Sequence, residues 1–374
     1  MINTYVPYLN KKDKSYLLKS LSSNFISTAG PNVKKFEEEF CSKYNFRYSV
    51  PLNSGTSALH LALLASGVKK EHLVLVPSYT FAATVNAINY CGAEPFFTDI
   101  DQNFIINIDQ IEDEIKKKQL IKKKKTLIDK KTKKKIHAII VVQSFGSKID
   151  FNKFNKFAKK YSLKIIFDSA ACHNPDIMGF KKETSQIFCF SFNGNKTLST
   201  GAGGIAATNS KKLADKLRLY STVGKKGGNY DYELIGYNYK MTNVQASLGL
   251  SQLKKIREIH DKKRKIFDLY SKLLKKNNKI NFFYNNKILN WVFFIILKNS
   301  KDFLELKKQM NFYNIQLDYF WKPLHLQKPY KNYRKFNLSN SKIMWKKVCV
   351  LPSHPSINKQ NQSKICKIIN KVLN

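Results

Sequence analysis

Short apolar runs alternate with stretches of helical spacing along the first two thirds of the chain. The clearest apolar runs lie at 72–76, 95–100, 138–142 and 163–168. Stretches in which apolar residues recur every three or four positions predict helices over 33–44, 57–66, 80–90 and 150–161. Continuous apolar strands that alternate with helices are typical of a mainly parallel sheet covered on both faces. We therefore expect an α/β fold.

The pattern changes after residue 242. A long helical stretch over 242–274 leads out of the first region, and only a few elements follow it. These are an apolar strand at 291–297 and helices near 301–312 and 359–372. A chain of 374 residues is long enough for a large domain and a smaller one. We place a large domain, with an N-terminal arm, at 1–250 and a smaller C-terminal α/β domain at 251–374.

One lysine and one aspartate carry the strongest chemical signal. Lys196 ends the stretch Ser-Phe-Asn-Gly-Asn-Lys, and the glycine-rich run 201–204 follows it. Asp168 ends an apolar run earlier in the chain. A pyridoxal-phosphate site needs a lysine that forms a Schiff base and an acid that partners the pyridine nitrogen. Lys196 alone would be interpreted as one more surface lysine, but together with Asp168 it favours such a site.

A third segment, Asn-Ser-Gly-Thr-Ser at 53–57, offers a place for a phosphate. Gly55 allows a tight turn, and Thr56 and Ser57 carry hydroxyl and N–H groups where the helical pattern begins. The free N–H groups of a helix N-terminus bind phosphate well. An ordinary helix N-cap explains the same residues when they are taken alone.

These segments resemble the DegT/StrS sugar aminotransferases, which are fold-type I pyridoxal-phosphate enzymes acting on nucleotide-linked keto-sugars. The similarity runs from about residue 30 to about residue 352. Matching segments include Gly30-Pro31, Ser54-Gly55-Thr56, Pro77 to Phe81, Gly92 to Pro95, Asp168 to Ala170, Ser191 to Lys196 and Gly236 to Tyr239. The stretch 191–196 is most similar to the branch that aminates position 4 of UDP-4-keto-6-deoxy-N-acetylhexosamines in bacillosamine and legionaminic acid pathways.

The resemblance implies an activity, a cofactor and a set of roles. It implies a pyridoxal 5'-phosphate-dependent aminotransferase with L-glutamate as donor, working in polysaccharide or glycan biosynthesis as a homodimer and using no metal. Lys196 and Asp168 are the implied catalytic residues. The implied cofactor-binding residues are Gly55, Thr56, Ser57, Phe81, Asp168, Ser191, Lys196 and Asn238, the last one reaching the neighbouring subunit's cofactor phosphate. His325 and Trp321 are implied to lie near the sugar.

Three positions depart from the family pattern. Ala171 stands where relatives carry Gln, His or Glu, so nearby His173 is a candidate for the missing polar contact. Lys240 replaces an arginine and keeps its charge without the guanidinium fork. Asp318-Tyr319 stands where relatives often carry Arg-Pro.

The net charge of +40 suggests an alternative interpretation, in which the chain is a nucleic-acid-binding protein. Nucleic-acid readers favour arginine, whereas the basic residues here are almost all lysines scattered along the chain, and no reader motif is present. The densest tract, 116–135, holds twelve lysines in twenty positions. We expect it to be a solvated surface insertion with too little apolar content to pack.

Other classes are disfavoured by absent signals. No apolar run approaches the length of a membrane span, the N-terminus lacks a signal-peptide layout, and the six cysteines show no paired spacing. We therefore expect a cytoplasmic protein with no membrane partner. A sugar dehydratase of the same fold typically carries histidine in place of the lysine, and a non-catalytic regulator would not need Asp168 and Lys196; both remain alternatives.

Overall fold

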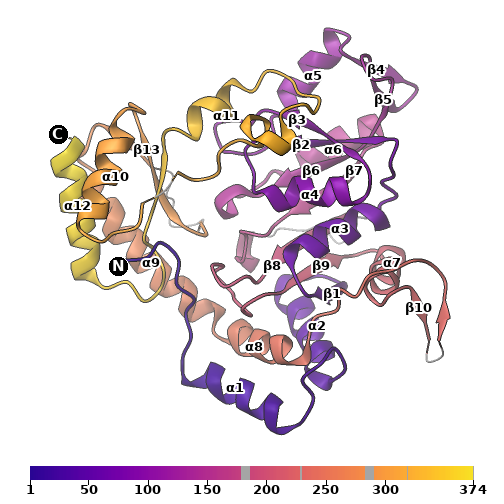
Figure 1. Ribbon diagram of the computed structural model, residues 1–374, viewed down its shortest axis with the longest axis horizontal. Helices are drawn as coiled ribbons and strands as arrows, with labels where there is room; N and C mark the ends of the chain where they lie inside the picture. Colours follow the sequence, from indigo (N-terminus) through magenta and orange to yellow (C-terminus); the bar gives the residue numbers. More distant parts are fainter. Residues whose placement is uncertain (178–185, 228–229, 283–289, 318, 374) are drawn as a thin grey trace.

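The structure is a computed structural model that describes residues 1–177, 186–227, 230–282, 290–317 and 319–373 (Figure 1). Its centre is a nine-stranded sheet in the order β1-β9-β8-β7-β6-β2-β3, with β4 and β5 attached beside β6. The strands are β1 (Tyr48–Leu52), β2 (His72–Pro77), β3 (Glu94–Thr98), β4 (Leu120–Lys123), β5 (Thr126–Asp129), β6 (Lys135–Val142), β7 (Lys164–Asp168), β8 (Ile187–Ser191) and β9 (Gly204–Thr208). The pairs β3–β2, β2–β6, β6–β7 and β7–β8 are parallel. The predicted α/β fold with a mainly parallel sheet is confirmed.

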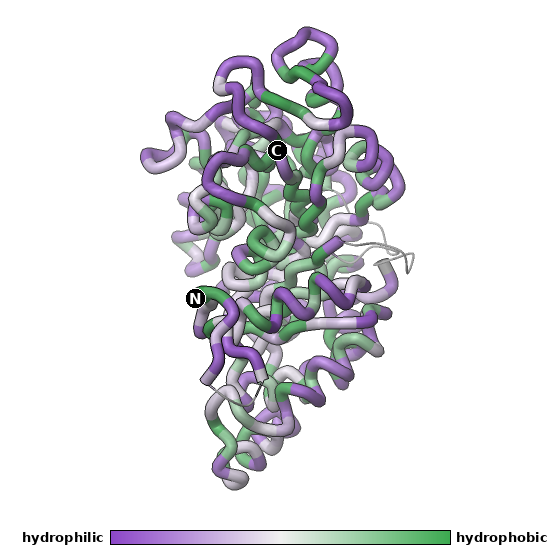
Figure 2. The backbone as a smooth tube through the Cα atoms, turned by 90° about the vertical axis from the view of Figure 1, so that its right-hand side faces the viewer, coloured by the Kyte–Doolittle hydropathy of each residue, from purple (hydrophilic) through white to green (hydrophobic). Residues whose placement is uncertain are grey.

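Helices cover both faces of this sheet, because its strands are apolar on both sides. The helices are α2 (Pro31–Tyr44), α3 (Gly55–Ala65), α4 (Ala82–Tyr90), α5 (Ile108–Lys116), α6 (Phe151–Tyr161), α7 (Lys211–Ser221) and α8 (Asn243–Lys254). One core contains side chains of α2, α5, α6 and α8, and the opposite core contains those of α3, α4 and α7. Figure 2 shows hydrophobic stretches through the middle of the molecule and hydrophilic stretches along its outer edges.

A second, smaller sheet forms the C-terminal unit. It consists of β12 (Ile280–Asn281), β13 (Phe293–Leu297) and β14 (Val348–Leu351), which pair antiparallel. The helices α9 (Ile256–Leu274), α10 (Asp302–Phe312) and α12 (Lys359–Leu373) pack on it around a core of their own. We propose that the domain boundary lies at 250/251, although residues 324–338 return to pack on the large sheet through Leu324, Tyr330 and Leu338.

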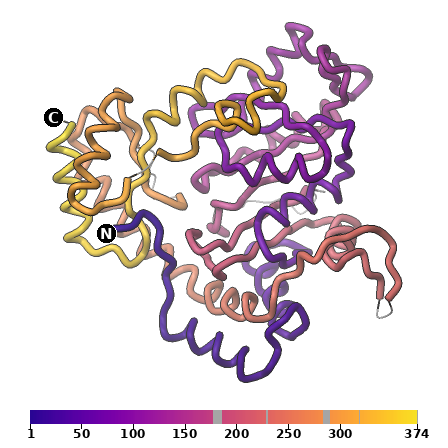
Figure 3. Tube along the Cα trace, in the orientation of Figure 1, coloured from indigo at the N-terminus to yellow at the C-terminus, as the bar shows by residue number. Residues whose placement is uncertain are grey.

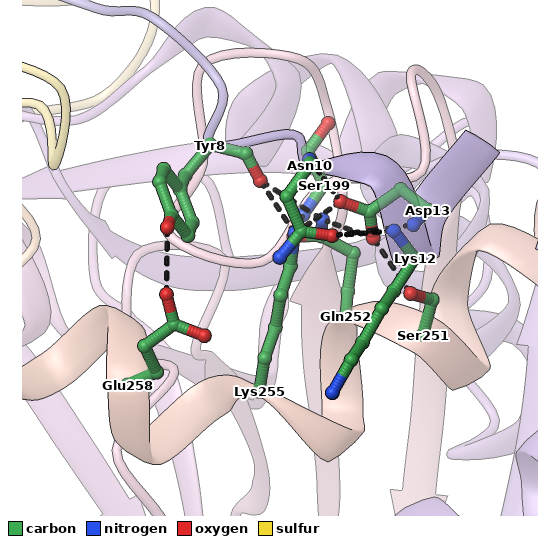
Figure 4. Close-up of polar contacts among 9 residues, drawn as sticks. All are labelled: Tyr8, Asn10, Lys12, Asp13, Ser199, Ser251, Gln252, Lys255 and Glu258. Carbon is green, nitrogen blue, oxygen red and sulfur yellow. Dashed lines mark hydrogen bonds and ion pairs between the residues drawn. The ribbon is translucent and has the colours of Figure 1, made fainter. Parts of the chain in front are cut away.

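The long helix expected over 242–274 is two helices. Lys255 interrupts it with φ near −104°, and its buried ammonium donates to the Tyr8 carbonyl and pairs with the Asp13 carboxylate. Ser251 and Gln252 also donate to Asp13, at 2.7 and 3.1 Å (Figure 4). Satisfying the buried Asp13 carboxylate brings these side chains together at the joint between α8 and α9.

The N-terminal arm carries a helix that the apolar pattern did not indicate. Helix α1 (Lys11–Ser22) begins at a capping box in which Asn10 and Asp13 satisfy each other's backbone N–H groups. The residues before it lie beside the C-terminal unit, where Ile2 pairs with Ile315, and both chain ends are on that side of the molecule (Figure 3). The arm therefore links the first residues of the chain to the last domain.

The lysine-rich tract is a β-hairpin, so the expectation that it cannot pack was wrong. Strand β5 pairs with β6, and Leu120 and Leu127 are fully buried in the large core. The buried Asp129 accepts a hydrogen bond from Arg334 at 3.2 Å. Two apolar anchors are enough because the neighbouring sheet edge supplies the remaining surface, and the lysines point outward, with eleven of the twelve exposed.

Replacing the exposed lysines 123, 124, 125, 130, 131 and 133 by glutamine is expected to leave turnover on saturating substrate within about twofold of the original. The reason is that none of them lines the cavity described below. Steady-state kinetics on a folded variant check this, and Leu127→Ala in the same hairpin is a contrast that should lower the free energy of unfolding by about 2–5 kcal/mol. A large fall in turnover for the glutamine variant would show that the tract reaches the site.

Two features are absent from the described part of the chain. None of its helices is both long and apolar enough to cross a membrane. Within the same residues, no three or more His, Cys, Asp or Glu side chains gather into a set that could hold a metal ion.

Candidate active site

A cavity of about 400 Å³ opens at the carboxyl ends of β6, β7 and β8. Ligands bind at this edge of an open parallel sheet because the strands end there and loops leave room between them. Of the residues implied by the resemblance, seven line the cavity: Gly55, Thr56, Phe81, Asp168, Ser191, Lys196 and Trp321. Segments that lie far apart in the sequence therefore meet in one place.

Asp168 lies at the end of β7, at the floor of the cavity, and only 5% of its surface is exposed. Thr84 donates to its carboxylate at 2.7 Å and the Ala170 N–H donates at 3.2 Å. Burial raises the pKa of Asp168, while these two donors and the charge of Lys196 act in the opposite direction. The carboxylate keeps acceptor capacity for one more cationic or N–H group in a dry environment.

Lys196 follows β8 in a turn and reaches into the same cavity. Burial lowers the pKa of its amine to about 8, and the charge of Asp168 partly opposes this shift. The Lys196 Nζ lies 3.7 Å from the centre of the Trp291 ring system. An amine with a pKa in this range is ready to act as a nucleophile and as a proton carrier near neutral pH.

The start of helix α3 forms a cradle opposite Ser191. Ser54 is its N-cap and accepts the Ser57 N–H at 3.0 Å, and Gly55 and Thr56 are the first two residues of the helix, whose N–H groups have no acceptor within the helix itself. A Cβ atom on Gly55 would lie 2.7 Å from the Cβ of Ser191, so only glycine permits this approach. The geometry and the hydroxyls suit a phosphate group.

Ser57 stands apart from the other two residues of this segment. Its hydroxyl donates to Asn53 at 2.6 Å, and its side chain does not line the cavity. Its hydrogen bonds complete the N-cap of α3, so Ser57 stabilises the start of this helix without lining the cavity.

Two aromatic side chains line the cavity. Phe81, at the N-cap of α4, has 59% of its surface exposed although it is a large apolar residue. Trp321 has a left-handed φ of 48°, a conformation that is uncommon outside glycine. An exposed ring beside a cavity is suited to stacking on a flat ligand.

Two implied residues do not reach the cavity of their own chain. The His325 imidazole is buried and hydrogen-bonds to Ser78 at 2.6 Å, and its contact with a sugar stays a prediction. Asn238 is exposed on the outside, where its carbonyl accepts from Asn53 at 3.4 Å. A site completed by a second subunit would account for its position.

The departures from the family pattern have structural outcomes. Ala171 lines the cavity, but His173 does not, because its ring packs 5.7 Å from that of Phe192 and burial lowers its pKa to about 3. The suggestion that His173 replaces the missing polar contact was therefore wrong. Gln143 lines the cavity instead, held by Ser169 at 2.5 Å. Asp318 lies outside the described residues.

Several lining residues escaped the sequence analysis. Thr84, Gln143 and Trp291 sit in ordinary helical or apolar patterns, and no local signal separates them from core residues. Thr84 is the clearest case, since its only special feature is the distance from its hydroxyl to Asp168. Only the sheet and the helices packed on it bring such residues to one place.

The fold is shared with a solved aminotransferase. A crystal structure of a DegT DnrJ EryC1 StrS aminotransferase from Brucella abortus matches with a TM-score of 0.85 and 27% identity, covering 97% of this chain and 95% of that one. The fold is thus that of the pyridoxal-phosphate-dependent sugar aminotransferases.

Curated relatives agree with this class. GDP-perosamine synthase of Escherichia coli O157:H7 is 33% identical over 377 residues, which cover 99% of this chain and 98% of that protein. The UDP-4-amino-4,6-dideoxy-N-acetyl-beta-L-altrosamine transaminase of Campylobacter jejuni strain 81-176 is 34% identical over 274 residues, 72% of this chain and 69% of that protein. The chain belongs to the DegT/DnrJ/EryC1/StrS aminotransferase family, whose model matches residues 7–370.

The protein is accordingly a sugar aminotransferase, and its cofactor is pyridoxal phosphate. The residues present fit this group: the missing side chain of Gly55 lets the start of α3 approach Ser191, whose hydroxyl suits a phosphate. The Asp168 carboxylate and the Lys196 amine face the same cavity.

Proposed function

We propose that this protein transfers the amino group of L-glutamate to carbon 4 of a nucleotide-linked 4-keto-6-deoxy sugar for glycan or polysaccharide biosynthesis. The observation that carries the proposal is the meeting of Lys196 and Asp168 in one cavity behind the α3 cradle, within a chain of this family. We further propose that Lys196 and Asp168 are the catalytic residues.

Each proposed role follows from the chemistry of the side chain. When bound, pyridoxal phosphate supplies an electron sink that stabilises a carbanion at the donor carbon. The Asp168 carboxylate, when ionised, would stabilise a positive charge on the pyridine nitrogen of the bound cofactor. The Lys196 amine binds the cofactor and, once released, moves a proton at the donor carbon, for which a pKa of about 8 is suitable.

The remaining residues of the proposed site bind and orient. The N–H groups of Gly55 and Thr56 and the Ser191 hydroxyl hold the phosphate, with Ser57 fixing the helix start. The Phe81 ring stacks on the flat cofactor ring. Trp321, which lines the same cavity, would contact the sugar.

The nucleotide has two candidates. The resemblance of segment 191–196 predicts UDP, and one relative named above is a UDP-sugar transaminase matched over 72% of this chain. The relative matched over 99% of this chain is named for a GDP-sugar product. We propose UDP and keep GDP as the second candidate.

A substrate panel tests the function. The purified protein with bound cofactor is incubated with glutamate and with UDP- and GDP-linked 4-keto-6-deoxy sugars, and 2-oxoglutarate and the amino sugar are measured. We expect product with one nucleotide series and none from Lys196→Ala. Conversion of glutamate by the cofactor-loaded protein without any amino-sugar product would contradict the proposed acceptor while preserving the transaminase class.

We also propose that the active unit is a homodimer with shared sites. A short hairpin of β10 (Lys225–Lys226) and β11 (Asp231–Tyr232) projects from the large domain (Figure 1). Apolar side chains near it are largely uncovered, with Tyr230 82% and Ile235 91% exposed. Exposed large apolar residues favour a protein partner, and a second copy would bring Asn238 to the other subunit's phosphate cradle.

Mixing two inactive variants is expected to restore activity. In a dimer of Lys196→Ala with Asn238→Ala, one of the two sites combines an intact Lys196 with an intact Asn238. At equal mixing half of the dimers are mixed, and each mixed dimer regains one of its two sites. About a quarter of the original activity should therefore return. Turnover after subunit exchange is the measurement, and each variant mixed with itself is the control. No recovery despite demonstrated exchange, or an active monomer, would refute shared sites.

A further inference from the structure

Trp291 contacts Lys196 directly but has no role in the function proposed so far. It precedes β13, belongs to the C-terminal unit and is only 5% exposed. The Lys196 Nζ lies 3.7 Å from the centre of its ring system, well within the roughly 6 Å at which an ammonium is attracted by an aromatic face. Among the described residues no hydrogen bond or ion pair of this ammonium is found, so the indole is the direct contact that the structure gives for it.

The surroundings fix the orientation of this indole. Its Nε1 donates to the carbonyl of Asn195, the residue directly before Lys196, at 2.8 Å. Its backbone N–H donates to Phe145 at 2.6 Å, and its carbonyl accepts from the buried ammonium of Lys263 at 2.5 Å. The ring of Tyr5, from the N-terminal arm, stacks on it with centroids 5.3 Å apart. An aromatic residue held by four such contacts keeps one face toward Lys196.

We propose that the indole face of Trp291 binds the Lys196 ammonium whenever Lys196 is not bonded to the cofactor, which makes Trp291 a positioning residue for the proposed catalytic lysine. The proposal rests on the role given to Lys196 under the proposed function. During transamination the amine must leave the cofactor and later return to it. A lysine side chain has a flexible stem of four carbons, so its free amine can move away from the cavity. The attraction of the indole face keeps the amine close to the cavity between its release from the cofactor and its return.

The direction of the effect on protonation follows from the attraction. A ring face stabilises the ammonium and not the neutral amine, so it raises the pKa of Lys196 above the value that the same buried amine would otherwise have. Two ionisable groups interact with Lys196 through their charge: Asp168, which acts in the same direction, and His173, whose pKa of about 3 leaves it neutral. The ionisable side chains of Tyr5, Tyr8, Lys263, Tyr319 and His354 also line the cavities that Lys196 lines. Weakening the ring face should therefore release a larger fraction of neutral amine at a given pH.

Fluorinated tryptophan tests this in the cofactor-free protein. Replacing all tryptophans by mono-, di- and trifluorotryptophan withdraws electron density from the ring face but keeps its shape and its N–H group. Trace labelling of amines with acetic anhydride between pH 6 and 10, followed by peptide mass spectrometry, gives the pKa and labelling rate of Lys196. Lys225, whose Nζ lies 4.3 Å from a tyrosine ring, is the internal control because that ring is unchanged.

We expect Lys196 at pH 7 to be labelled progressively faster with each added fluorine, about two- to fivefold in total, while Lys225 is unchanged. In Trp291→Leu the same fluorination should have no effect on Lys196, because the other two tryptophans make no such contact with it in the described structure. The proposal would be overturned if the labelling rate of Lys196 did not change with fluorination. It would also be overturned if the rate still rose with fluorination in Trp291→Leu. The attachment of the cofactor to Lys196 is tested separately, by borohydride reduction followed by peptide mapping. A failure of the Trp291 proposal can therefore be distinguished from a failure of the proposed function.

Discussion

Replacing Lys196 by alanine is expected to lower transamination turnover by about a thousandfold or more. Acid–base catalysis by a placed amine alone contributes about 10²–10⁴-fold, and the covalent attachment of the cofactor is lost as well. In the original protein, borohydride reduction followed by peptide mapping should place the cofactor on Lys196. In the variant no covalent tag should form, although cofactor held by the α3 cradle can still bind reversibly.

Two matched variants sharpen this test. Lys196→Arg keeps a positive charge over Trp291 but cannot form the covalent bond, so it should be as inactive as the alanine variant. Lys160→Ala removes an exposed lysine on α6 that does not line the cavity and should retain activity. A tag on another lysine, or no tag while cofactor is present, would remove Lys196 from its proposed role.

The Asp168→Asn variant is expected to keep some cofactor but lose transamination by a factor on the order of a hundred or more. A neutral amide cannot hold a positive charge on the pyridine nitrogen as a carboxylate does, and a charge-assisted contact is strong in a site as dry as this one. Single-turnover rates with glutamate measure the loss, and the visible spectrum reports how much cofactor remains bound.

Thr84→Val is the matched control for Asp168. It removes the hydroxyl that donates to the carboxylate at 2.7 Å but leaves the charge, so we expect a loss of about tenfold or less. Near-original turnover in Asp168→Asn would exclude Asp168 from its role. An equal loss in both variants would mean that the hydrogen-bonded arrangement, and not the charge, determines the rate.

The sequence by itself predicted the four neighbouring parallel strands β2, β3, β6 and β7, together with helices α2, α3, α4 and α6. It did not indicate the strands β1, β4, β5, β8 and β9 of the same sheet. Continuous apolar runs such as 138–142 can be buried on both faces only in a covered parallel sheet, so the pattern predicted the architecture. Lys196 and Asp168 were recognisable because few residue types can perform their chemistry, because Asp168 ends an apolar run, and because a glycine-rich run follows Lys196.

Local pattern failed where a distant contact decides the outcome. Lys255 stands in an unbroken helical pattern, yet its pairing with Asp13 from the N-terminal arm accompanies a break between two helices. The lysine-rich tract was expected not to pack, but the edge of β6 gave its two leucines a surface to bury against. In both cases the partner lies far away in sequence, where periodicity carries no information.

The same reason explains what could be known of the site. The cofactor segments were visible in the sequence, but Thr84, Gln143 and Trp291 became part of the site only when α4, β6 and the C-terminal unit were placed around it. A hydroxyl that serves a carboxylate, or an indole that faces an ammonium, is defined by a distance of a few ångströms and not by its neighbours in the chain. The sequence determined which chemistry this protein carries, and the tertiary structure decided which side chains surround it.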